Sequence, residues 1–299
     1  MQKRNGKKTP RKATMRTRNE IVHLKDLVAQ ASRILFHEKL ADYHGHVSAR
    51  VPGTRTLLIK PILVPLNKIR SKDILALNMD DFVAFRQSKQ APSGQERKAP
   101  SEKETEPAPG ETTLHVSIYD YVAFLQSKQA PSEQEKKAPF KREMELAPGE
   151  TILHLAIYEA RPDVFSVVHT HQPLATAFSI ANVPILPVFA SAARNAPCTP
   201  ILQNPQTIRT IEMAQEAAQA LGQASSLLLR NHGVVVVGRT VQEATAGAVY
   251  LERNAYMQLV ATLLGNAAPI PEQFIKELAT NMNRLAPVSF NYFTSLFSK

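Results

Sequence analysis

The stretch from Leu153 to His171, LHLAIYEARPDVFSVVHTH, contains a helix, a break and a strand in direct succession. Apolar residues recur at helical spacing in its first part, and Pro162 ends that helix because proline cannot continue one. The run from Val164 to His169 is typical of a buried strand. Side chains two apart on a strand point to one face, so His169 and His171 can reach the same metal ion.

A third imidazole follows in Asn231-His232-Gly233, between two expected strands at 226–229 and 234–237. The glycine permits a close approach of the backbone at this turn. Three histidines with one open coordination position are typical of a catalytic zinc site. An H-x-H pair alone is weak evidence, however, because two polar residues can close a strand without binding metal.

The remaining chain alternates helix and strand, which predicts a layered α/β domain. Helices are expected at 20–37, 174–180, 208–221 and 241–264, and further strands at 47–51, 57–63, 74–77 and 185–189.

A tandem repeat interrupts this pattern. Residues 81–119 match residues 120–158 at 27 of 39 positions. A solenoid needs at least three stacked units, whereas the middle of each copy has almost nothing to bury. We therefore predict a duplicated loop segment, partly disordered, inserted in one globular domain.

Composition narrows the class of protein. The chain has 299 residues, nine histidines and a single cysteine, Cys198, so it forms no internal disulfide and a metal site must use histidine and carboxylates. No apolar run approaches the roughly 20 residues of a membrane span, and we expect a soluble, cytoplasmic protein. Eight of the excess basic charges lie in residues 1–19, which predicts a disordered basic tail. Non-specific contact of this tail with nucleic acid is the alternative.

Three separated blocks resemble the class II aldolase/adducin family: GHVSAR at 45–50, the stretch at 153–171, and LLLRNHGVVVVGRTVQEA at 227–244. They occur in the family's order and span residues 20–265. The resemblance implies a three-layer α/β/α domain with a central mixed, largely antiparallel sheet, and we expect a helical extension at 266–299. The GHVS motif is similar to that of a decarboxylase-like subgroup.

The resemblance also implies the roles of the site residues. His169, His171 and His232 would hold a divalent metal, most commonly zinc, with manganese or cobalt as alternatives. Glu150 stands 19 residues before the first of these histidines and would serve as metal-shell residue and acid/base. We expect the closed site to raise its pKa. An ordinary first-turn acid remains the alternative for Glu150, and its duplicate Glu111 is a rival.

His154 follows Glu150 by four residues, and we expect it, like its duplicate His115, to lie in the core or behind the ligands. His46 and Ser48 of the GHVS motif are predicted to contact substrate, while His44 is not expected to bind the metal.

The family's phosphate-binding hydroxyl groups are missing, because the corresponding stretches 60–64 and 147–149 read KPILV and APG. A family tyrosine that donates a proton is also absent between 183 and 200. A metal that keeps its full charge polarises a carbonyl and stabilises a developing enediolate. We therefore expect a lyase for a small, non-phosphorylated oxo or hydroxy acid, acting by aldol cleavage or decarboxylation.

Two alternatives remain: a non-catalytic scaffold like adducin, and a sugar-phosphate aldolase or epimerase. Family members commonly form tetramers with sites between subunits. The resemblance thus implies a homo-oligomer, in which Tyr292 is a possible contact to a neighbouring subunit's site.

Overall fold

The computed structural model describes residues 15–90 and 139–297, and its strands form one mixed sheet. The strand order is β3-β2-β1-β4-β7-β6-β5, and every neighbouring pair is antiparallel except β5 and β6. This confirms the mixed, largely antiparallel sheet. The strands are β1 (His46–Arg50), β2 (Thr56–Ile59), β3 (Leu75–Asn78), β4 (Ser166–Thr170), β5 (Ile201–Leu202), β6 (Ser226–Leu229) and β7 (Gly233–Gly238).

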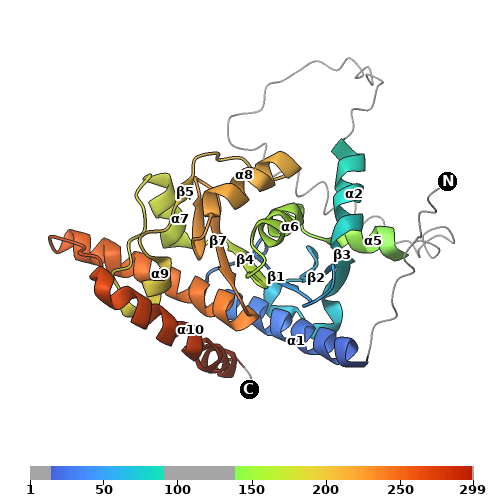
Figure 1. Cartoon of the computed structure of the whole chain (residues 1–299), viewed down its shortest axis with the longest axis horizontal. Coiled ribbons are helices and arrows are strands. Elements are labelled where there is room, and N and C mark those ends of the chain that lie inside the picture. The colour runs from blue at the N-terminus through green and yellow to red at the C-terminus, as the bar shows by residue number, and fades with distance from the viewer. Residues whose placement is uncertain (1–14, 91–138, 298–299) are drawn as a thin grey trace, which may run out of the picture.

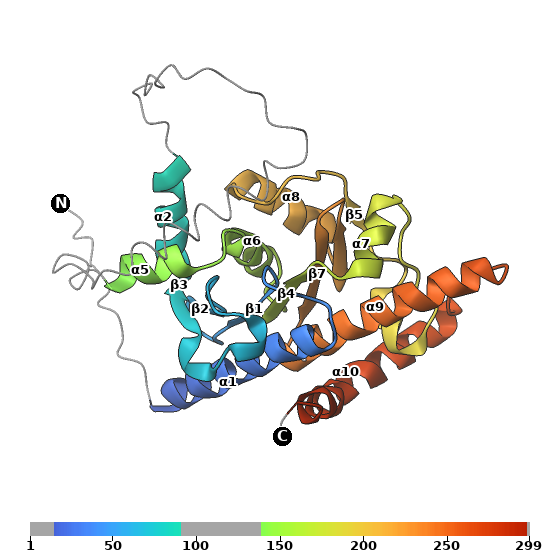
Figure 2. The same ribbon diagram turned by 180° about the vertical axis from the view of Figure 1, so that it is seen from behind.

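Helices cover both faces of the sheet, which gives three layers (Figures 1 and 2). One face packs against α1 (Met15–His37), α7 (Pro173–Ile180), α9 (Val241–Leu263) and α10 (Glu272–Ser295). The other packs against α2 (Met79–Gln90), α5 (Pro139–Leu146), α6 (Thr151–Ala160) and α8 (Ile211–Leu221). Short 3₁₀ turns are η1 (Leu66–Lys68), η2 (Ser71–Asp73) and η3 (Ala190–Asn195). None of the described helices is long and apolar enough to cross a membrane.

The two cores follow from the alternation of side chains along each strand. In β4, Val168 faces the core beneath α1 and α9, whereas Val167 faces the core beneath α6 and α8. In β7, Val234 and Val236 face the first core and Val235 the second. Because both faces are covered, these strands are apolar throughout rather than alternately polar.

Several predicted elements differ from the structure. The strand expected at 57–63 ends at Ile59, and the helix expected at 208–221 begins at Ile211. The first helix begins at Met15 rather than at residue 20, so the last residues of the predicted tail are helical. The strand expected at 185–189 is wrong, because the segment makes only a single bridge, between Ile185 and Thr199. Prolines at 184 and 187 remove ladder donors. The amides of Val188 and Phe189 instead donate to the Asn254 side chain of α9.

The repeated segment contains packed helices as well as a connection. The first copy begins with α2, whose Phe82 is buried, so the prediction of a loop is wrong for residues 81–90. The second copy ends in α5 and α6, where Met144 and Ile152 are buried. In the first copy the equivalents of these two residues are Thr105 and Thr113. Residues 91–138, with Glu111 and His115, lie outside the described ranges.

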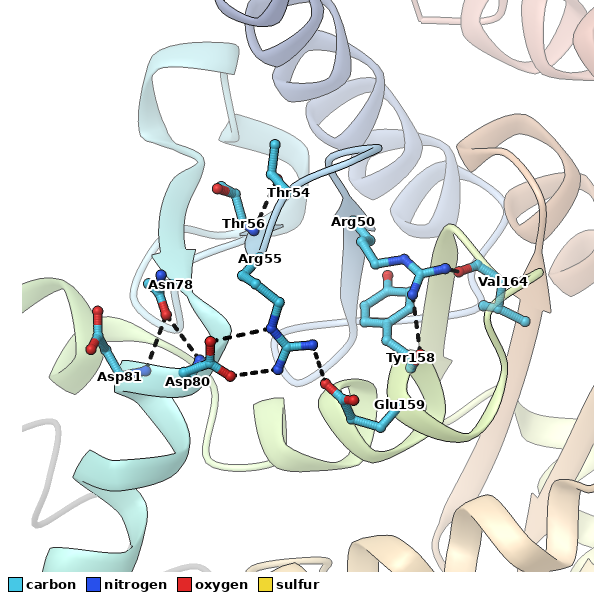
Figure 3. A network of polar contacts seen from close by, with 10 residues as sticks. All are labelled: Arg50, Thr54, Arg55, Thr56, Asn78, Asp80, Asp81, Tyr158, Glu159 and Val164. Carbon is cyan, nitrogen blue, oxygen red and sulfur yellow. Dashed lines mark hydrogen bonds and ion pairs between the residues drawn. The ribbon is translucent and has the colours of Figure 1, made fainter. Parts of the chain in front are cut away.

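Polar contacts join the β1–β2 hairpin to helices on the second face of the sheet (Figure 3). Arg55 pairs with Asp80 at the start of α2 and with Glu159 near the end of α6. Asn78 accepts hydrogen bonds from the first amides of α2, as an N-cap residue does. The Arg55 pairs are half exposed and contribute at most about 1 kcal/mol each, so they orient the helices more than they stabilise the fold.

The repeat yields a matched pair of deletions. Removing residues 81–119 joins Asp80 to the second copy and rebuilds α2 with only two changes, Tyr121 in place of Phe82 and Leu125 in place of Arg86. We expect the fold to survive with a thermal midpoint within about 5 °C of the full chain. Halving a loop changes its closure cost by only about 0.6 kcal/mol. Thermal unfolding followed by circular dichroism checks this.

The mirror deletion, residues 120–158, is the control. It retains Glu111 but places Thr105, Pro107 and Thr113 where Met144, Leu146 and Ile152 now stand. A lost buried methionine and a proline inside a helix together cost about 3 kcal/mol or more. Equal midpoints for the two deletions would show that the second copy is not the packed one.

Candidate metal centre

Glu150, His169, His171 and His232 converge in the structure. One ligand atom from each of the four residues lies within 4.8 Å of the others. His169 and His171 come from β4 and the residue just beyond it, His232 from the turn between β6 and β7, and Glu150 from the N-terminus of α6. The described residues contain no other such group of histidine, cysteine and carboxylate ligands.

Strand pairing explains how distant histidines meet. In the sheet β4 lies between β1 and β7, which sets His169 opposite both His46 and Val235. His232 precedes β7, in a turn where Asn231 adopts a positive φ of 58°. Asparagine tolerates that backbone conformation better than most residues. The rings of His169, His171 and His232 consequently lie with centroids 5.0 to 5.1 Å apart.

Gly233 is needed for this approach. A Cβ at residue 233 would lie 2.5 Å from the Thr170 carbonyl oxygen and 2.7 Å from Cδ2 of His171. Both distances are shorter than van der Waals contact, so a side chain would push β7 away from the end of β4. The close backbone approach that the sequence predicts is confirmed.

The orientation of the rings suits a metal. Nδ1 of His169 lies 3.0 Å from the Val234 carbonyl oxygen and donates to it, which leaves the lone pair of Nε2 facing the cluster. Nε2 of His169 and Nε2 of His171 are 3.1 Å apart. Nδ1 of His232 is buried and has no hydrogen-bond partner. The donor set and its spacing therefore fit a divalent cation held by three imidazoles.

Glu150 is anchored at one oxygen and free to act with the other. Its Oε1 accepts a hydrogen bond of 3.0 Å from the Ile208 amide, while Oε2 lies 3.4 Å from Nε2 of His169 and 3.6 Å from Nε2 of His232. Burial acts to raise the pKa of Glu150, but the electrostatic attraction of His169 and His232 and the hydrogen bond from the Ile208 amide outweigh it and lower that pKa to about 2. The expected upward shift concerns a site closed around the metal and stays a prediction.

The imidazoles are in the form that binds metal. Burial and the neighbouring histidines lower the pKa of His171 to about 3 and that of His232 to about 4. Both rings are therefore neutral at pH 7, with lone pairs available, while Glu150 is ionised. Metal binding near neutral pH needs no proton to be removed from these groups.

A buried polar network supports the cluster from behind. Nδ1 of His46 is 2.8 Å from Nε2 of His154, whose Nδ1 is 2.6 Å from the hydroxyl of Ser48. The same hydroxyl is 2.7 Å from the Tyr158 hydroxyl. Ser48 is fully buried and its hydroxyl is engaged within the protein, and its contact with substrate stays a prediction. Its structural task is to hold His154.

Sequence reasoning placed His154 behind the ligands, as the structure does, but missed Tyr158 and Ile208. Glu150, His154 and Tyr158 are spaced by four residues, which puts them on one face of α6. That spacing was a readable signal. The hydrogen bond from the Ile208 amide has no such signal in the sequence, because any residue except proline can supply a backbone donor.

The remaining predicted residues lie apart from the four ligands. The ring of His44 has its centroid 6.0 Å from that of His171, and its amide donates to Asp42. His46 is buried, with its ring centroid 5.0 Å from that of His169. Tyr292 is 58% exposed on α10, in contact with Phe293.

Fold and site together define a three-layer α/β protein with a histidine and carboxylate cluster suited to metal. The family model for the class II aldolase and adducin N-terminal domain matches residues 26–125 and 133–259, which is more than half of the chain. The chain therefore belongs to the class II aldolase and adducin family.

Curated relatives include both decarboxylases and aldolases. The chain is 30% identical over 126 residues to 3,4-dihydroxyphthalate decarboxylase of Arthrobacter keyseri, covering 40% of this chain and 50% of that protein. It is 32% identical over 130 residues to L-fuculose phosphate aldolase of Escherichia coli K12, covering 42% of this chain and 58% of that protein. The matched part thus spans only about half the length of these relatives.

Solved structures share the fold over nearly the whole chain. L-fuculose 1-phosphate aldolase from Glaciozyma antarctica superposes with a TM-score of 0.63 at 20% identity, covering 97% of this chain and 94% of that one. The corresponding aldolase from Thermus thermophilus has a TM-score of 0.54 at 21% identity, covering 83% of this chain and 98% of that one. At these identities the likeness concerns the fold alone.

The cluster predicts which histidines bind metal. Replacing His169 or His232 by Ala removes one of three neutral donors, so dialysed protein loaded with zinc, cobalt or manganese should lose most of its one bound ion per chain. His44→Ala should retain it, because His44 lies outside the four converging ligands. Metal analysis of the purified variants measures this, and equal loss in His44→Ala would mean that the ligand set is wrong.

Gly233 gives a second prediction. Gly233→Ala should weaken metal affinity at least about tenfold, because the new Cβ displaces the backbone beside His171. Gly149→Ala is the matched control, since it neighbours Glu150 but its Cβ would meet no atom within 4 Å. Competition with a metal indicator measures both variants. Unchanged affinity in Gly233→Ala would refute the role of the close approach.

Proposed function

We propose that this protein is a divalent-metal-dependent lyase that cleaves or decarboxylates a small, non-phosphorylated oxo or hydroxy acid. The observation that carries the proposal is the convergence of Glu150 with three histidines within 4.8 Å. An adducin-like scaffold has no need of that arrangement. Membership in a family with aldolase and decarboxylase relatives supports a lyase.

In this proposal His169, His171 and His232 hold the ion, and a bound divalent ion supplies a Lewis acid for a substrate carbonyl or hydroxyl oxygen. The three neutral imidazoles leave the positive charge of the ion uncompensated. The Val234 carbonyl fixes the ring of His169, so that its Nε2 stays directed at the cluster. Zinc is the ion we favour, because three histidines with a further open position suit it.

Glu150 is the proposed acid/base residue. The Ile208 amide holds Oε1 in place, and Oε2 remains on the side of the histidines, where it can accept or return a proton. Its low pKa in the metal-free protein makes it a carboxylate at rest, as a base must be. His46 is the proposed substrate contact beside it, with His154 holding its ring.

The lack of hydroxyl donors at 60–64 and 147–149 supports a substrate without phosphate. We further propose a homotetramer in which Tyr292, exposed on α10, reaches a neighbouring subunit's site.

The test is Glu150→Gln. Metal content and fold should be retained, because the ion is held by imidazoles, while turnover should fall by roughly 10² to 10⁴ when a general base is removed. Activity is found first by screening oxo and hydroxy acids for aldehyde, ketone or carbon dioxide release in the metal-loaded protein.

Glu111→Gln is the control for this prediction, since Glu111 is the repeat equivalent of Glu150. It should change turnover little. If Glu111→Gln abolishes activity and Glu150→Gln keeps it, the first copy supplies the catalytic carboxylate. In that case the assignment is wrong.

A further inference from the structure

Lys60, directly after β2, is a buried cation without a counter-charge. The side chain belongs to a residue only 1% exposed. Its one hydrogen bond runs from Nζ to the Ile62 carbonyl oxygen at 3.5 Å, the outer limit of such a bond. None of the carboxylates in residues 15–90 and 139–297 forms an ion pair with it. A buried unpaired charge is costly, and a side chain kept in that state needs a reason.

Lys60 follows β2, which is paired with the strand that carries His46. Its amide donates to the Val47 carbonyl oxygen, next to His46. Ile59, the residue before Lys60, is paired with Ser48 of β1, two residues after His46.

On its other side, Nζ of Lys60 lies 6.0 Å from the centroid of the Tyr43 ring. Tyr43 contacts His44, with ring centroids 5.0 Å apart, and His44 in turn lies beside His171. Lys60 is thus connected to the histidine cluster on one side through β1 and on the other through Tyr43 and His44.

We propose that Lys60 is the carboxylate-binding residue of the substrate site, pairing with one carboxylate of a small dicarboxylic acid whose other oxygens face the histidine cluster. This rests on the proposed function and narrows its substrate class. A single ammonium suits a carboxylate monoanion better than a phosphate dianion, which uses several donors. The substrate would then carry two carboxylates.

The charge state of Lys60 agrees with this role. Burial lowers its pKa to about 8, so the group is still mainly protonated at pH 7. A carboxylate bound beside it supplies the opposite charge that none of the described residues provides there, and stabilises the protonated form.

The test is calorimetric titration of the full, metal-loaded chain with malonate, succinate and phthalate, with propionate and benzoate as monocarboxylates and with inorganic phosphate. At least one dicarboxylate should bind about tenfold or more tightly than the monocarboxylates and phosphate. Lys60→Met should abolish that preference with metal content unchanged, and Lys60→Arg should keep part of it. Lys68→Met, which changes an exposed lysine of η1, is the matched control and should behave like the natural chain.

A preference that survives Lys60→Met, or tighter binding of phosphate than of every dicarboxylate, overturns the inference. Failure of the proposed function is distinguishable, because it appears as absent metal or as unchanged turnover in Glu150→Gln. The same titrations on metal-free protein then decide on Lys60 alone, through loss of carboxylate binding in Lys60→Met.

A measurement on the unaltered chain tests the proposal even if Lys60→Met does not fold. In protein labelled with ¹⁵N at lysine side chains, a buried ammonium exchanges protons slowly and gives its own signal. We expect the Lys60 signal to shift on adding the bound dicarboxylate while exposed lysines stay unchanged. An unshifted Lys60 signal at saturating acid contradicts the proposal.

Discussion

Glu150 and the three histidines converge so closely that their backbones have to be held within about half an ångström of the required geometry. The sheet provides that precision, because β4 is hydrogen-bonded on both sides and carries His169 between β1 and β7. A residue on an edge strand or a long loop would not be held as firmly. The bare backbone of Gly233 then lets the turn before β7 bring His232 against the end of β4.

Helix α6 supplies the residues of the site that do not come from the sheet. It presents Glu150 at its N-terminus and His154 and Tyr158 further along the same face. All three are buried, and each finds polar partners: the Ile208 amide for the carboxylate, His46 for His154, and Ser48 for Tyr158. Buried polar groups that are satisfied in this way rigidify a site, whereas unsatisfied ones would destabilise it. Lys60 is different because none of the described carboxylates forms an ion pair with it.

The two copies of the repeat differ in their apolar residues. The second copy carries Met144 and Ile152, which fill the core beneath α6, whereas its counterpart has Thr105 and Thr113. Yet the first copy supplies α2, with Phe82 in that same core. The domain therefore takes its apolar residues from both copies, from the start of one and from the end of the other.

The sequence by itself determined the layered fold and the identity of the converging histidines. Runs such as Val234 to Val237 and the helical spacing of α6 are strong local patterns, and side chains two apart on a strand share a face. The tertiary structure alone decided what those patterns do not encode. The segment 185–189 is apolar enough for a strand, but its amides bond to side chains of α9. The low pKa of Glu150, the engagement of Ser48 and the isolation of Lys60 depend on which groups meet across the fold, and such long-range contacts leave no trace in local sequence.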